Sequence, residues 1–118
     1  MRRREILKMR IERSRQGNIL VIEAGGNIDR ISAEQLGSFL QYEIEAGKRF
    51  LVLDLQSVTN MGHDGLWEMV AALKHVRRAQ GDLRLAQPSD RVRDALEISG
   101  LDQIFRIFES QADAVASF

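Results

Sequence analysis

The chain opens with alternating apolar and charged side chains, the pattern of a β-strand with one side in water. Residues 7–12 follow this two-residue period, which is typical of a strand whose apolar side faces a core. Turn-prone residues at 14–18 lead to the apolar run at 19–22. We therefore expect the first two strands to form a hairpin, and Gly25, Gly26 and Asn27 to end the second strand.

The pattern then changes to a helical period. Apolar residues recur at spacings of three and four, which predicts one buried helical face. These residues are Ala33, Leu36, Leu40 and Ile44. Ser32 with Gln35 three residues later forms a capping box and predicts the start of this helix. Gly47 predicts its end.

A second apolar run, at residues 50–55, has five apolar residues in six and no alternation. Such a run favours a strand that is covered on both faces, as in the middle of a partly parallel sheet. A second helical stripe follows and ends at Gly81. Its members are Leu66, Met69, Val70, Leu73 and Val76.

The remaining chain alternates strand and helix. We expect a strand at residues 83–86, a helix that opens at Pro88 and Ser89, a strand at 104–108 and a terminal helix from Ser110. The predicted order is ββαβαβαβα. Helices between successive strands imply right-handed crossovers. The prediction is therefore an α/β fold with a mixed β-sheet, made of the N-terminal hairpin and parallel strands, packed with helices.

Length and composition fit a single globular domain over residues 1–118. Hydrophobic residues make up 44% and charged residues 29% of the chain, which are ordinary values for a soluble domain. There is no cysteine, so a disulfide framework is excluded. No apolar window approaches the roughly 18 residues of a membrane span, and the start lacks the apolar core of a signal peptide. We expect a cytoplasmic protein without direct membrane insertion.

Basic residues gather near the start. Residues 1–16 hold seven Lys and Arg against two Glu, in a chain of net charge +0. This patch could attract phosphates or a membrane surface. A solvated strand face with a frayed basic end at residues 1–5 explains it as well. No aromatic residues are interleaved for base stacking, so we expect no nucleic acid partner.

The stretch "SVTNMGHDGLW", residues 57–67, joins the buried strand to the second helix and carries Asp64 at the junction. An aspartate on such a turn could be a nucleophile. Here the similarity to aspartate-nucleophile hydrolases of the α/β-hydrolase fold covers only residues 62–65, and the second glycine is one position too early. A phosphorylated receiver aspartate would need an acidic pair for Mg²⁺, which this chain lacks after its first strand. The sequence therefore predicts no enzyme.

Other chemistry also lacks a pattern. His63 and His75 stand twelve residues apart, which is no zinc spacing, and no phosphate-binding glycine motif is present. We expect no metal and no cofactor. As local structure, Asp64 is predicted to cap the second helix by accepting the amide of Trp67. Trp67 lies off the buried stripe, which suits either a partner surface or partial cover by neighbouring loops.

Four segments together resemble a STAS domain, the fold of bacterial anti-sigma factor antagonists. They are "GGNID" at 25–29, "FLVLDLQSV" at 50–58, "GL" at 65–66 and "QPSDRVRDALEISGLDQIF" at 87–105. The last segment, with its Leu-x-x-x-Gly-Leu, is the most specific. The resemblance spans roughly residues 6–117 and implies a single STAS domain.

In that family, a serine or threonine before a glycine in the loop after the third strand is phosphorylated by a partner anti-sigma factor, a GHKL-type serine kinase. Here Asp64 takes this position, Gly62 and His63 also depart from the pattern, and Gly65 and Leu66 agree with it. The resemblance implies a non-enzymatic interaction module in partner switching. Asp64 would be a permanent partial phospho-mimic, because its charge is about −1 where phosphoserine carries about −1.5 to −2.

The predicted partner surface lies around this position. It comprises Asn27, Asn60, Met61, Gly62, His63, Asp64, Gly65 and Trp67. Two alternatives remain open: a structural STAS subunit of a larger sensory or lipid-transport assembly, and a STAS domain that binds a nucleotide. The oligomeric state is not predicted.

Overall fold

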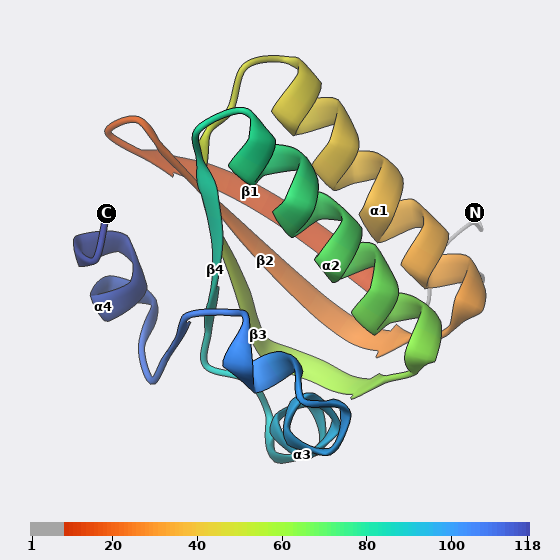
Figure 1. Ribbon diagram of the computed structural model, residues 1–118. Helices are drawn as coiled ribbons and strands as arrows, with labels where there is room; N and C mark the ends of the chain where they lie inside the picture. Colours follow the sequence, from red (N-terminus) through yellow and green to blue (C-terminus); the bar gives the residue numbers. More distant parts are fainter. Residues whose placement is uncertain (1–8) are drawn as a thin grey trace, which may run out of the picture.

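One five-stranded sheet carries the fold (Figure 1). The structure is a computed structural model, and it describes residues 9–118. The strands lie in chain order, and only the first pair is antiparallel. They are β1 (Met9–Gln16), β2 (Ile19–Ile28), β3 (Phe50–Met61), β4 (Asp82–Ala86) and β5 (Ile107–Phe108). The predicted mixed sheet and N-terminal hairpin are confirmed. The frayed end predicted for residues 1–5 and the first positions of the predicted strand lie outside the described residues.

Helices cover both faces of the sheet. In Figure 1, α1 (Arg30–Glu45) and α2 (His63–Arg78) run side by side across one face. α3 (Asp90–Ser99) and the short 3₁₀ helix η2 (Leu101–Gln103) lie at one end of the sheet, and α4 (Gln111–Ala116) lies near the C-terminus. The predicted order ββαβαβαβα is confirmed, with η2 as an addition.

β3 is buried on both faces, as its unbroken apolar run predicts. Leu51 and Leu53 are 0% exposed and belong to the main core under α1 and α2. Val52 points the opposite way because successive strand residues alternate, and it joins a smaller core with Val21 and Ala114 of α4. The sheet is therefore the middle layer of the molecule along β3.

The predicted start of α1 is wrong by about one turn. The helix begins at Arg30 with Asp29 as its N-cap, and the Ser32 amide donates to Asp29 Oδ1 at 2.9 Å. Ser32 is itself buried inside the first turn. The N-cap needs extended backbone, and this backbone occurs at Asp29 (φ −84°, ψ −168°). The Ser32–Gln35 capping box does not form at the position that the sequence suggested.

The predicted strand ends also need correction. Gly25, Gly26 and Asn27 do not end β2, which continues to Ile28, and β3 continues to Met61. Gly26 has φ +99°, which glycine adopts without strain. Pairing with β3 continues past it through two register shifts, one on each side of the Gly25–Gly26 pair. The last predicted strand shrinks to β5, because η2 and the turn after it occupy residues 101–105.

A buried carboxylate holds the C-terminal part of the chain against β3. Asp54 is 5% exposed. Its Oδ2 accepts from Gln87 Nε2 and Gln111 Nε2, both at 2.8 Å, and its Oδ1 accepts from the Gln56 amide at 3.0 Å. Buried carboxylates are tolerated when they are hydrogen-bonded in this way. Gln111 also donates to Glu23 at 3.0 Å, so the first residue of α4 is tied to two strands.

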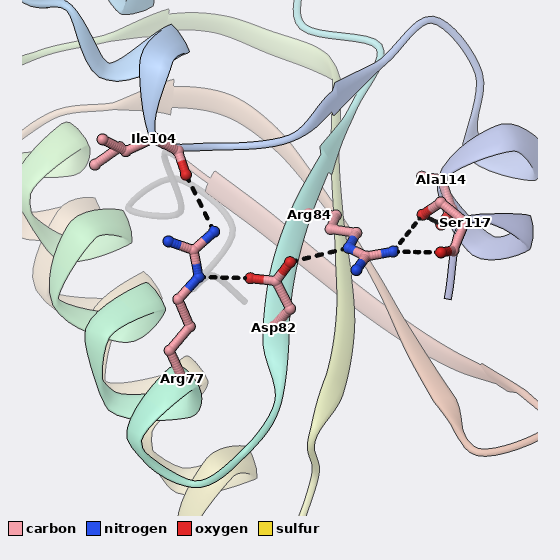
Figure 2. A network of polar contacts seen from close by, with 6 residues as sticks. All are labelled: Arg77, Asp82, Arg84, Ile104, Ala114 and Ser117. Atoms are coloured by element: carbon pink, nitrogen blue, oxygen red, sulfur yellow. Dashed lines mark hydrogen bonds and ion pairs between the residues drawn. The ribbon is translucent and has the colours of Figure 1, made fainter.

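A chain of polar contacts links the end of α2 to the end of α4 (Figure 2). Arg77 Nε donates to Asp82 Oδ1 and Arg84 Nε to Asp82 Oδ2, each at 2.9 Å. Arg77 Nη2 also reaches the Ile104 carbonyl at 3.1 Å. Arg84 Nη1 donates to the carbonyl of Ser117 at 2.6 Å and to its hydroxyl at 2.8 Å. These contacts hold the end of α4 on the same face of the sheet where Asp54 holds its first residue, Gln111.

Candidate partner-binding site

The first turn of α2 places Asp64 differently from the prediction. Gly62 is the N-cap, with extended backbone at φ −87° and ψ −173°, and the Leu66 amide donates to the Gly62 carbonyl at 3.2 Å. Asp64 is the second residue inside the helix, so the prediction that it caps the helix is wrong. The cap has no side-chain hydrogen bond. Asp64 therefore projects from the first turn without a role in starting the helix.

Gly65 allows this turn to pack closely against the ends of β2 and β3. A Cβ at Gly65 would lie 2.7 Å from Met61 Cγ and 3.1 Å from Ile28 Cγ2. The Gly62 amide donates to the Ile28 carbonyl at 3.3 Å. Gly65 and Met61 are buried at this contact. The ends of β2 and β3 thus form a platform that fixes the direction of α2 and of its exposed side chains.

The charge of Asp64 is favoured by the helix. Its side chain is exposed, and no ion pair of Asp64 occurs within residues 9–118. The first amides of a helix lack intrahelical acceptors and give this end a partial positive charge. A negative side chain in the first turn gains about 0.3–1 kcal/mol from it. A carboxylate is thus well placed here, and so would be a phosphate.

Trp67 and His63 form an aromatic pair on the same side of α2. Their ring centroids lie 6.0 Å apart with a tilt of 58°, and Trp67 is 56% exposed. The prediction that Trp67 lies off the buried stripe is confirmed. Next to it is a shallow apolar slot of about 80 Å³, lined by His63, Leu66, Trp67, Ser99 and Leu101. Ser99 and Leu101 were not predicted, because nothing in the sequence pattern brings the end of α3 to the start of α2.

The two asparagines of the predicted surface lie side by side. Asn27 and Asn60 are partners in the β2–β3 ladder, and both are exposed. Of the eight predicted surface residues, Met61 and Gly65 are buried below the others. The remaining six lie exposed at the end of the sheet and on the first turn of α2. The structure therefore collects the exposed members of the predicted surface in one region.

The second histidine of the chain lies far from Asp64 along α2. His75 lies eleven residues further along α2, which at about 1.5 Å per residue is roughly 16 Å away. Groups of three or more potential metal ligands do not occur between residues 9 and 118. Within the same part of the chain, no helix is long and apolar enough to cross a membrane. What the region offers is an exposed charge, two amides, an aromatic pair and an apolar slot.

Known proteins share both the sequence pattern and the fold. The family model of the STAS domain matches residues 10–114. The Bordetella bronchiseptica protein BtrV, which carries a provisional name as an anti-sigma factor antagonist, is 31% identical over 110 residues, covering 93% of this chain and 95% of that protein. An anti-sigma factor antagonist from Mycobacterium paratuberculosis has a similar solved structure, with a TM-score of 0.84, 21% identity and coverage of 92% of each chain.

The anti-sigma factor antagonist SpoIIAA is similar in two solved forms. Its unphosphorylated form gives a TM-score of 0.79 at 18% identity and covers 90% of this chain and 93% of that one. The phosphorylated form, from Bacillus, gives a TM-score of 0.73 at 17% identity, with coverage of 92% and 98%. At these identities the likeness concerns the fold alone.

Proposed function

This chain belongs to the STAS-domain family, and on this basis we propose that it binds an anti-sigma factor with serine-kinase activity in bacterial partner switching. Its sequence and fold are those of an anti-sigma factor antagonist-like STAS domain. The binding surface that we propose centres on the exposed first turn of α2, with Asn27 and Asn60 beside it. Met61 and Gly65 support this surface from below.

The observation that carries the proposal is an exposed carboxylate at the start of α2. Asp64 directly precedes Gly65, at the position where the family resemblance puts the phosphorylated hydroxyl. SpoIIAA has been solved in an unphosphorylated and a phosphorylated form, so a protein of this fold can carry phosphate. Asp64 cannot be phosphorylated by a serine kinase because it has no hydroxyl group. Its charge is fixed at about −1, compared with about −1.5 to −2 for phosphoserine.

A fixed charge leaves two modes of action. In the first, the carboxylate acts like phosphate and keeps the chain from binding the kinase. In the second, the partner has adapted to the carboxylate, so binding occurs and cannot be switched off at this position. The two modes predict opposite effects when the charge is removed: Asp64→Ala should strengthen binding in the first and weaken it in the second.

A pull-down from an extract of the native cells tests the proposal. Wild type, Asp64→Ser and Asp64→Ala are used as baits, and any kinase recovered is incubated with each bait and ATP. We expect mass spectrometry to find phosphate on residue 64 of the serine variant only. Asp64→Ala is the matched control, because it removes the charge without adding a hydroxyl. If Asp64→Ser neither changes partner binding nor becomes phosphorylated, the lost-acceptor account is wrong.

The structural-subunit alternative gives a different result in the same pull-down. A STAS subunit of a sensory or lipid-transport assembly would recover the other subunits of that assembly in fixed stoichiometry. Exchange of Asp64 would not change the recovery of these subunits.

The nucleotide-binding alternative predicts thermal stabilisation of the chain by millimolar ATP or GTP. The cytoplasmic location also remains a prediction.

A further inference from the structure

The slot beside Trp67 has a volume and a lining that suit the binding of one apolar side chain. Its volume is about 80 Å³, far below the roughly 300–1,000 Å³ of pockets that hold small molecules. Leu66, Trp67 and Leu101 supply apolar walls. The Ser99 hydroxyl donates to the carbonyls of Ala95 at 2.8 Å and Leu96 at 3.1 Å. The donor proton of this hydroxyl is thus used within α3, and the slot presents mainly carbon to a partner.

The chain segment that lines the slot carries further exposed apolar side chains. Ile98 is 87% exposed and Ile104 is 40% exposed, and both lie on the chain segment that contributes Ser99 and Leu101. Trp67 itself is 56% exposed. Exposed apolar side chains on segments that meet beside an exposed aromatic residue are typical of binding sites for other proteins.

The segments that form the slot carry only negative charge. Residues 60–73 and 94–105 contain no Lys or Arg, in a chain that has 17 of them. Their acidic residues are Asp64, Glu68, Asp94, Glu97 and Asp102. Of the cations that border these segments, Arg93 is paired with Glu109. Arg77, which donates to the Ile104 carbonyl, is paired with Asp82. Asp64 and Asp102 each directly follow a slot-lining residue in the chain, so acidic residues are the sequence neighbours of the slot lining on both segments.

We infer that the partner presents one aliphatic side chain flanked by basic side chains, with the aliphatic group inserted between Trp67 and Leu101. The basic groups then face Asp64 and Asp102. This inference rests on the proposed function, since it concerns the same partner surface, and it states the chemistry of the partner's contact. Complementary charge around a buried apolar anchor gives orientation as well as affinity.

Short peptides provide the probe. The ¹⁵N-labelled chain is titrated with acetylated, amidated peptides Arg-Leu-Arg, Arg-Ala-Arg and Glu-Leu-Glu at millimolar concentration. Trp67 is the one tryptophan of the chain, so its indole N–H gives a single assigned signal. We expect Arg-Leu-Arg to shift this signal and the amides of Ser99 and Leu101. The other two peptides should each bind at least about fivefold more weakly. Arg-Ala-Arg lacks the aliphatic anchor, and Glu-Leu-Glu lacks the two ion pairs.

Protein variants make the test specific. Trp67→Ala should abolish the shifts at Ser99 and Leu101. Tyr42→Ala is the matched control, because Tyr42 is an aromatic residue that is 69% exposed on α1, and its removal should leave the titration unchanged. The double variant Asp64→Lys with Asp102→Lys should reverse the preference and bind Glu-Leu-Glu more tightly than Arg-Leu-Arg.

Equal shifts with all three peptides, or no shift with any of them, would overturn the inference. It would also be overturned if the same signals shifted with protein concentration in the absence of peptide, because a second copy of the chain would then occupy the slot. The peptide titration needs no kinase. If Asp64→Ser is phosphorylated while the peptide preference is absent, only the slot inference fails. If the preference is present while no kinase is recovered, only the proposed function fails.

Discussion

A single methyl group at Gly65 should loosen the first turn of α2. In Gly65→Ala the new Cβ would lie 2.7 Å from Met61 Cγ, 3.3 Å from Met61 Sδ and 3.1 Å from Ile28 Cγ2. Ile28 is 0% and Met61 5% exposed, so neither side chain can move into solvent without losing buried contacts. Overpacking of a core costs about 1–3 kcal/mol, and alanine regains at most about 1 kcal/mol in helix propensity. We expect a net loss of about 1 kcal/mol.

Urea denaturation measures this loss as a lower midpoint at unchanged slope. Gly62→Ala is the matched control: it is the same substitution three residues earlier, with nothing within 4 Å of the new Cβ and φ at −87°. It should cost no more than about 0.5 kcal/mol, because alanine is a poorer N-cap than glycine but lowers the entropy of the unfolded chain by an offsetting amount of about 0.4–1 kcal/mol.

A double-mutant cycle with Met61→Ala tests the cause. If the clash with Met61 is responsible, Gly65→Ala should cost about 1 kcal/mol less when Met61 has already been truncated. If Gly65→Ala stabilises the chain, or if the two substitutions show no coupling free energy, the reasoning that α2 packs tightly against the strand ends is refuted.

Two further predictions concern the opposite face of the sheet. Asp54→Ala should destabilise the chain by about 2 kcal/mol, because the half-buried amides of Gln87 and Gln111 lose a charged acceptor; Asp54→Asn should cost less in the same denaturation experiment, and equal losses would contradict the role of the carboxylate. Arg84→Met should leave the core intact while hydrogen exchange of the Ser117 amide accelerates about tenfold; unchanged exchange would mean that Arg84 does not hold α4.

The element order could be predicted because each element has its own period. The apolar run at residues 50–55 indicates a strand buried on both faces before its neighbouring strands are known. The apolar stripe of α2 predicts which side of the helix faces the core, and Trp67 lies outside that stripe. The boundaries of the elements could be predicted less accurately than their order. Asp29 and Gly62 are caps because their backbones are extended at the place where the sheet ends, whereas Ser32 and Asp64 have side chains that suit a cap but lie inside the helix.

Long-range contacts explain the other omissions. The Gly25–Gly26 pair suggests a strand end, but pairing with β3 extends β2 to Ile28. Asp54 interrupts an apolar run, and only the folded chain shows that Gln87 and Gln111 converge on it. Likewise the apolar slot needs residues from α2 and from the end of α3. Such contacts depend on how the crossovers are arranged in space, which local periodicity does not encode.

The exposed position of Asp64 has a consequence for how such a protein changes over generations. Its side chain caps nothing and has no ion-pair partner in the described part of the chain, and the helix end gains only about 0.3–1 kcal/mol from its charge. Exchanging aspartate for serine, or the reverse, would therefore hardly alter folding. Under the proposed function, selection at this site can act on partner binding alone, and a regulated copy and an unregulated copy can then arise from each other without passing through a misfolded intermediate.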